Sequence, residues 1–217
     1  MKKLVIIGAG GFGREVYCSA TESNGYGSEF EIVGFLDDNI HALDDFKGYP
    51  PVLGTISDYV PTLNDVFVCA IGNVHVRKTI SQEIINKGGH FISLIHKSAY
   101  ISKNVELGVG CLIFAGVRIH CDVKLGDYVM IQPSAIIGHD TIIGDWSLIN
   151  TMSICGGASK IGECVTIHIN SFVMPGAVIE NDVTVGAGSV TMRRVKAGRT
   201  VFGVPAKYIV IPQTSND

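Results

Sequence analysis

Charge is scarce in this sequence. Only 17% of the 217 residues are charged, and the net charge is −3. Nucleic acids and anionic membranes attract proteins with strongly basic surfaces, so this balance gives no reason to expect either partner. Disordered chains combine low hydrophobicity with high charge. The hydrophobic fraction of 47% therefore favours a folded protein with a substantial core.

Long apolar runs and paired cysteines are also missing. The apolar run that opens the chain, residues 4–7, stops at Gly8, which is too short for a signal peptide, and no stretch approaches the length of a membrane helix. We therefore expect a cytoplasmic protein without membrane insertion. None of the six cysteines forms a Cys-x-x-Cys pair. We expect no metal site, and most of the cysteines should be small buried hydrophobes.

What the sequence does contain is a repeat of six residues. Sixteen positions in register carry fifteen aliphatic residues and one cysteine: Ile95, Ile101, Leu107, Ile113, Ile119, Leu125, Ile131, Ile137, Ile143, Ile149, Cys155, Ile161, Ile167, Val173, Ile179 and Val185. A period of six fits neither an α-helix nor strands joined by hairpins. It predicts coils of short parallel strands with the aliphatic residue inside, stacked about 4.8 Å apart.

Small residues accompany the repeat. The residue two places before each aliphatic is small or β-branched, which suits a crowded corner. Glycine follows the aliphatic at seven positions: Gly108, Gly126, Gly138, Gly144, Gly156, Gly162 and Gly186. We expect these glycines to relieve backbone strain at the corners of the coil.

The first 90 residues have a different pattern. Apolar runs over 4–7, 32–36 and 66–71 predict strands, and helices are expected through Val16 and over 74–86, the second ending before Gly88. Strands that alternate with helices indicate a small Rossmann-like α/β unit. Gly8-x-Gly10-x-x-Gly13, with Asp37 downstream, matches a dinucleotide fingerprint. Only half a dinucleotide fold would fit, so a nucleotide-diphosphate group other than NAD is favoured; a turn without ligand stays an alternative.

Several motifs, taken in chain order, resemble one family. They are the glycine turn, Phe35-Leu36-Asp37-Asp38, Ala70-Ile71-Gly72-Asn73, Gly138-His139-Asp140, Gly144-Asp145, Ile169-Asn170-Ser171 and Gly203-Val204-Pro205-Ala206-Lys207. Together they are similar to the bacterial hexapeptide-repeat sugar O- and N-acetyltransferases, which act on nucleotide-linked amino sugars or sialic acid. The resemblance implies an α/β domain over 1–90, a left-handed parallel β-helix over 91–195 with three hexads per coil, and a C-terminal segment over 196–217. It also implies a homotrimer with active sites between subunits.

The implied activity is transfer of an acetyl group from acetyl-CoA to an amine or hydroxyl of a nucleotide-linked sugar, for surface-glycan biosynthesis. His139 would be the general base, with Asp140 beside it. The implied substrate-binding residues are Gly10, Gly11, Phe12, Asp37, Asp38 and Gly72, and the implied coenzyme-binding residues are Leu148, Gly157, Ile169, Ala187 and Gly188.

The chemistry suits a histidine, because an imidazole with a pKa of about 6.5 can accept the proton that the attacking amine or hydroxyl loses. With three hexads per coil, His120 shares the corner of His139 on an adjacent coil and is the alternative base.

Some relatives carry histidine where this chain has Phe12 and Leu148. These two departures leave the sugar and the acyl preference open.

Other functions compete with this interpretation. Within the family, the acceptor could be sialic acid or another sugar hydroxyl. A non-catalytic nucleotide-binding trimeric scaffold is the alternative outside enzymes. A β-helical zinc carbonic anhydrase needs two ligand histidines close in sequence, and His120, His139 and His168 are too widely spaced for that. Serine acetyltransferases carry a helical first domain, which the α/β pattern argues against.

Overall fold

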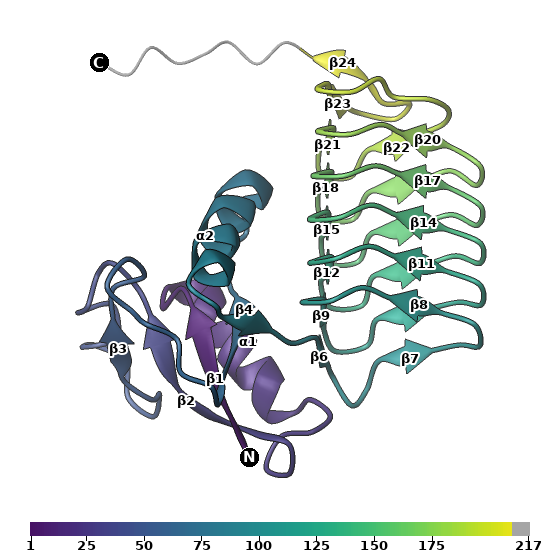
Figure 1. Cartoon of the computed structure of the whole chain (residues 1–217). Coiled ribbons are helices and arrows are strands. Elements are labelled where there is room, and N and C mark those ends of the chain that lie inside the picture. The colour runs from purple at the N-terminus through teal and green to yellow at the C-terminus, as the bar shows by residue number, and fades with distance from the viewer. Residues whose placement is uncertain (210–217) are drawn as a thin grey trace, which may run out of the picture.

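The computed structural model describes residues 1–209 as an α/β domain packed beside a β-helix (Figure 1). The first domain has a five-stranded parallel sheet in the order β3-β2-β1-β4-β5. Its elements are β1 (Lys2–Ile7), α1 (Gly11–Thr21), β2 (Phe30–Leu36), β3 (Val52–Gly54), β4 (Asp65–Cys69), α2 (Val74–Asn86) and β5 (His90–Phe91). Neither helix of the described chain is long and apolar enough to cross a membrane.

The glycine turn joins β1 to α1 by a very close approach. Gly8 has φ +97°, a conformation that L side chains rarely adopt. A Cβ on Gly13 would overlap the carbonyl oxygen of Gly8, so only glycine lets α1 lie this close to the strand. The helix begins at Gly11, inside the predicted turn, and presents its first backbone N–H groups to the space beyond β1.

Helix α2 has the predicted boundaries. They could be predicted because specific residues mark both ends of the helix in the sequence. The Asn73 side chain accepts hydrogen bonds from the backbone N–H groups of His75 and Val76, both at 3.1 Å. At the other end, Gly88 has φ +87°, a conformation that stops the helix. The short strands β3 and β5 were not expected.

The β-helix has three flat faces, each a stack of short parallel strands. Face 1 contains β6 (Leu94–Ile95), β9 (Leu112–Ile113), β12 (Met130–Ile131), β15 (Leu148–Ile149), β18 (Thr166–Ile167), β21 (Thr184–Val185) and β23 (Thr200–Phe202), with β24 (Lys207–Ile209) antiparallel to β23. Face 2 contains β7 (Tyr100–Ile101), β10 (Arg118–Ile119), β13 (Ile136–Ile137), β16 (Ile154–Cys155), β19 (Phe172–Val173) and β22 (Val190–Thr191). Face 3 contains β8 (Glu106–Leu107), β11 (Lys124–Leu125), β14 (Ile142–Ile143), β17 (Lys160–Ile161) and β20 (Val178–Ile179).

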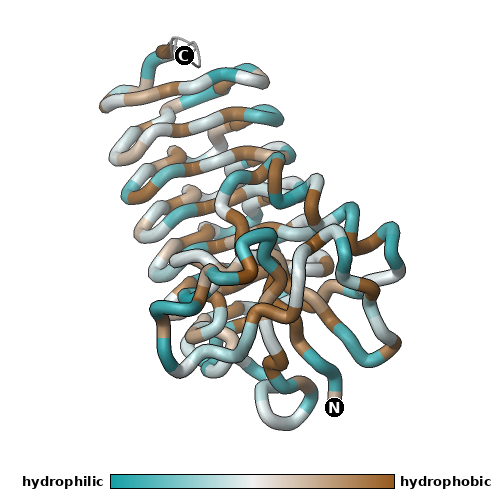
Figure 2. Tube along the Cα trace, turned by 90° about the vertical axis from the view of Figure 1, so that its left-hand side faces the viewer, coloured by the Kyte–Doolittle hydropathy of each residue, from teal (hydrophilic) through white to brown (hydrophobic). Residues whose placement is uncertain are grey.

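The six-residue repeat is confirmed as the source of this fold. From β6 to β19, each strand pairs with the strand three hexads further along the chain, as Ile131 does with Ile149. Every periodic position from Ile113 to Val185 is buried. Figure 2 shows the coils stacked on one another, with hydrophobic residues recurring on each coil. The chain is thus an α/β domain followed by a left-handed parallel β-helix.

The expected role of the seven repeat glycines was wrong. Positive φ falls three residues after the periodic aliphatic, at fifteen positions six residues apart from Asn104 to Gly188, with values from 53° to 70°. The seven glycines do not have positive φ. A Cβ there would meet the next coil instead, for example 2.5 Å from the backbone nitrogen of Gly157 in the case of Gly138. Glycine is therefore needed at these seven positions because neighbouring coils approach closely, and not because the backbone is strained.

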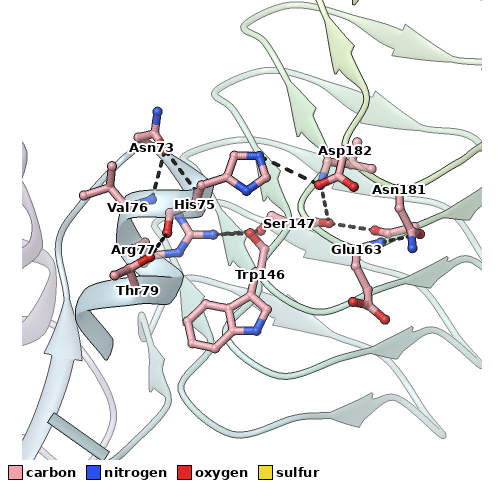
Figure 3. A network of polar contacts seen from close by, with 12 residues as sticks. Asn73, His75, Val76, Arg77, Thr79, Trp146, Ser147, Glu163, Asn181 and Asp182 are labelled. Carbon is pink, nitrogen blue, oxygen red and sulfur yellow. Dashed lines mark hydrogen bonds and ion pairs between the residues drawn. The ribbon is translucent and has the colours of Figure 1, made fainter. Parts of the chain in front are cut away.

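The two domains are joined by contacts with the lower coils. Arg77 of α2 is only 2% exposed, and its guanidinium donates hydrogen bonds to the backbone carbonyls of Trp146 and Ser147 (Figure 3). Burial lowers the pKa of Arg77 to about 10, which still leaves it charged at neutral pH. His96 is buried and pairs with Glu22 at 3.0 Å. These polar contacts hold the α/β domain against face 1.

Four of the six cysteines are buried, as expected: Cys69, Cys111, Cys155 and Cys164. Cys18 is exposed on α1 and Cys121 is partly exposed. All six thiols are free.

Candidate functional site

His139 lies at the corner of the β-helix between face 2 and face 3. Its backbone carbonyl accepts a hydrogen bond from Ala158 on the next coil, and the N–H of Asp140 donates to Cys121 on the coil before. Asp140 has φ 58°, so the chain turns sharply just after the histidine. The histidine is thus fixed by coils on both sides, while its side chain remains 64% exposed.

The imidazole of His139 is oriented by its neighbour. Nδ1 lies 2.7 Å from Oδ2 of Asp140. Because a carboxylate can only accept, Nδ1 carries the hydrogen and Nε2 keeps its lone pair. An ionised carboxylate in this place also stabilises the imidazolium that forms when Nε2 takes a proton. This is the arrangement that a general base requires.

Gly157 leaves the space that the imidazole occupies. A Cβ on Gly157 would lie 2.6 Å from Nε2 of His139 and 2.9 Å from Cε1. Gly157 does not have positive φ, so its backbone would accept another residue. What excludes a side chain at Gly157 is therefore the histidine ring, and the predicted base and this predicted coenzyme-binding residue are in direct contact.

His120 lies at the same corner, one coil earlier. Its side chain is exposed, and within residues 1–209 it has no carboxylate in hydrogen-bond contact. The nearby Asp122 is bonded instead to Asn104, at 2.9 Å. The geometry therefore favours His139 over His120 as the base.

The six predicted substrate-binding residues surround one cavity of about 430 Å³. It lies at the carboxyl ends of the strands of the parallel sheet, where ligands of open α/β folds bind. The residues that line it are Gly8, Gly10, Gly11, Phe12, Gly13, Asp37, Asp38, Ile56, Ala70, Ile71, Gly72 and Ile80. The sequence motifs thus converge in space, although they come from well-separated parts of the first domain.

The two aspartates hold the rim of this cavity. Both carboxylate oxygens of Asp37 accept backbone hydrogen bonds, from Ala9 at 2.7 Å and from Asn39 at 2.9 Å. Asp38 accepts from the N–H of Ile56 at 3.3 Å. Asp37 thereby ties the end of β2 to the glycine turn and positions the backbone that faces the cavity.

A second cavity, of about 440 Å³, shares Gly11 with the first. It lies between α1 and the corner that joins face 1 to face 2, and Arg14, Glu15, Phe114 and Pro133 are among its lining residues. These lining residues were not predicted from the sequence. The only signal was that Arg14 and Glu15 follow directly on the glycine turn, because Phe114 and Pro133 come from coils far along the chain.

The predicted coenzyme-binding residues do not lie together in one chain. Gly157 is at the corner between faces 2 and 3, whereas Ile169, Ala187 and Gly188 are at the corner between faces 1 and 2. Leu148 is only 6% exposed on face 1, where it lines a cleft with Asn73 of the α/β domain. The full width of face 2 separates the two corners.

Comparisons with known proteins show which family shares this architecture. Residues 3–84 match the family described as PglD N-terminal domain, and residues 116–151 and 158–192 match the family described as bacterial transferase hexapeptide (six repeats). The acetyltransferase domain of PglB from Neisseria gonorrhoeae FA1090, solved in complex with acetyl coenzyme A, is 30% identical with a TM-score of 0.85. The alignment covers 96% of this chain and 99% of that domain. This chain belongs to the bacterial hexapeptide-repeat sugar acetyltransferases.

Two further members of this acetyltransferase family are similar to the chain. PerB from Caulobacter crescentus, solved in complex with CoA and GDP-perosamine, is 28% identical over 97% of this chain and 98% of that one, with a TM-score of 0.87. The UDP-N-acetylbacillosamine N-acetyltransferase of Bacillus subtilis (strain 168) is 30% identical over 119 residues, 53% of this chain and 52% of that protein. The matches to curated relatives span 19% and 52% of those proteins' lengths.

Proposed function

We propose that this protein transfers the acetyl group of acetyl-CoA to an amine of a nucleotide-linked sugar, with His139 as general base, in the cytoplasmic stage of bacterial surface-glycan biosynthesis. The observation that carries the proposal is the 2.7 Å pair of His139 and Asp140, which leaves Nε2 free in a chain that also has the glycine-lined cavity. The nucleotide would lie in that cavity, with its sugar directed to the second cavity across Gly11.

The relatives support an amine rather than a hydroxyl as acceptor. The Bacillus subtilis relative is named as an N-acetyltransferase, and PerB was solved with GDP-perosamine and CoA. The acetyltransferase domain of PglB was solved with acetyl coenzyme A. We therefore assign two substrates to this chain: a nucleotide-linked sugar that carries an amine, and acetyl-CoA.

In the proposed reaction, the geometry of His139 allows it to act as the base. The sugar amine attacks the thioester carbonyl, and Nε2 of His139 takes the proton that the nitrogen loses as the C–N bond forms. Asp140 stabilises the imidazolium at Nδ1. The tetrahedral intermediate then expels the CoA sulfur, which receives the proton from the imidazolium. The products are the N-acetylated sugar and free CoA.

The active site would form between copies in a homotrimer. Face 2 has a largely apolar outer surface, with Ile136, Ile154, Phe172 and Val190 as the outward residues of four successive strands. On face 3 the corresponding residues include Glu106, Lys124 and Lys160. Packing face 2 of three copies around one axis would bring the His139 corner of one copy against the Ile169 corner of the next. The separated coenzyme-binding residues would then line one groove.

A charge on face 2 should prevent this assembly. Ile154→Glu is expected to give monomers in light scattering and to abolish acetyl transfer, because a carboxylate would be buried against an apolar surface. Ile142→Glu is the matched control, since Ile142 is the corresponding exposed isoleucine on face 3, and it should remain trimeric. A trimer with Ile154→Glu, or a wild-type monomer with full activity, would contradict the intersubunit site.

The proposed reaction can be tested by thiol release from acetyl-CoA against UDP- and GDP-linked amino sugars, free amino sugars, sialic acid and serine. We expect release with one nucleotide-linked amino sugar, and mass spectrometry should place the acetyl group on nitrogen. Release with sialic acid alone would favour sugar O-acetylation. Silence throughout, without measurable binding of acetyl-CoA, would favour the non-catalytic scaffold.

A further inference from the structure

A cleft of about 440 Å³ lies between the start of α2 and face 1 of the β-helix. Three residues of its lining bring potential metal ligands together: His75, Cys164 and Asp182. Their ligand atoms, a ring nitrogen, the thiol sulfur and a carboxylate oxygen, all lie within 4.8 Å of one another. Figure 3 shows the His75 ring reaching from α2 toward Asp182.

The three side chains are mounted on well-supported backbone. His75 is in the first turn of α2, which the Asn73 side chain caps. Cys164 and Asp182 occupy the same corner on consecutive coils, with φ 53° and 59°. Their N–H groups each donate to the coil before, at 2.9 Å. The ligand atoms are thus gathered by the fold rather than by one flexible loop.

The chemistry of the set matches a zinc-type ion. Imidazole nitrogen, thiolate sulfur and carboxylate oxygen are all zinc ligands, and three of them leave a fourth position for water. Nε2 of His75 and Oδ1 of Asp182 are 3.8 Å apart. Two such ligands on a tetrahedral zinc lie about 3.3 Å apart, given bonds of about 2.0 Å, so a small side-chain rotation suffices.

We propose that His75, Cys164 and Asp182 bind one divalent transition-metal ion of the zinc type, which bridges the α/β domain and the β-helix. The thiolate and the carboxylate together balance the charge of the ion, and neutral His75 donates its Nε2 lone pair. On binding, Cys164 releases its thiol proton to solvent as the metal–sulfur bond forms. The site lies away from the corner of His139, although the same cleft is also lined by Gly72 and Leu148, which are predicted to bind substrate and coenzyme.

Binding should strengthen as pH rises. Burial raises the pKa of the Cys164 thiol, and the carboxylates of Asp182 and Glu163 raise it further, while Lys78 and Arg77 oppose them. The thiol is therefore protonated at neutral pH, and the metal must displace that proton. We expect the affinity to rise about tenfold per pH unit while the thiol remains protonated, because one proton is released per ion.

Titration of the metal-free full-length chain with Co²⁺ tests the site. We expect a thiolate-to-cobalt charge-transfer band in the near ultraviolet that saturates at one ion per chain and disappears when Zn²⁺ is added. Cys164→Ser should abolish the band, and Ser134 already occupies the same position of another hexad with φ 61°, so serine fits this backbone. Asp182→Asn keeps the thiol and should weaken Co²⁺ binding at least tenfold.

Two controls separate this site from adventitious binding. Cys18→Ser removes an exposed cysteine, and His41→Ala removes an exposed histidine that pairs with Asp44 at 2.8 Å. Both variants should bind Co²⁺ as the wild type does. Absence of the band in the wild type, its survival in Cys164→Ser, or its loss in Cys18→Ser would overturn the proposal.

Discussion

His139→Ala is expected to lower the rate of acetyl transfer by about 10²–10⁴-fold, the usual contribution of a positioned general base. The side chain is 64% exposed in the single chain and lies outside the core, so its removal should leave the fold unchanged. The loss should appear in kcat, measured by release of CoA. Binding of acetyl-CoA, measured by calorimetry, should change little.

The control for this variant is His120→Ala. His120 is exposed at the same corner, one coil earlier, and lacks the carboxylate that orients His139. It should keep most of the wild-type rate. If His120→Ala lost transfer while His139→Ala retained it, the base would be His120, and full activity in both variants would remove histidine from the mechanism.

Gly157→Ala should be nearly as damaging to catalysis without harming the fold. The added methyl group would lie 2.6 Å from Nε2 of His139, so the ring must move away from its place beside Asp140. A misplacement of about 1 Å can cost about 10²-fold in rate. We expect a fall of that size in kcat, with an unchanged melting temperature, because only a flexible side chain has to give way.

Gly138→Ala is the contrasting variant, because its methyl group would also crowd Gly157, but at the backbone of Gly157. Its methyl group would lie 2.5 Å from the backbone nitrogen of Gly157, which cannot rotate aside. The melting temperature should therefore fall, as measured by circular dichroism. If Gly157→Ala were the less stable of the two, or if it turned over normally, the positioning role of Gly157 would be disproved.

The sequence predicted most of the β-helix, because one requirement recurs at every sixth residue. A single inward aliphatic per hexad, as at Ile131 and Ile149, fixes both the strand and its partner on the next coil. Helix α2 was predictable for a local reason, since Asn73 and Gly88 mark its two ends. In contrast, β3 and β5 have three and two residues, too few to show an alternation of apolar and polar side chains.

The candidate site was predictable only in part, because its residues come from distant positions. Motifs pointed to His139 as the predicted base and to six residues of the first domain, and the fold brings those six together around the glycine-lined cavity. Contacts across the domain boundary left no local signal: Arg77 and Trp146 are 69 residues apart, and Glu22 and His96 are 74 apart. The same holds for His75, Cys164 and Asp182, whose spacing matches no metal motif.

The attachment of the α/β domain to the lower coils fixes the distance between the glycine-lined cavity and His139. Phe12 stacks on Phe114 and Arg77 bonds to Trp146, so the glycine-lined cavity is anchored at a set level of the stack. His139 occupies a definite coil of the same stack. Because coils repeat about every 4.8 Å, the height of His139 above the cavity can change only in whole steps of that size. The number of coils between this anchor and His139 thus fixes the length that a substrate would need in order to span from the cavity to His139.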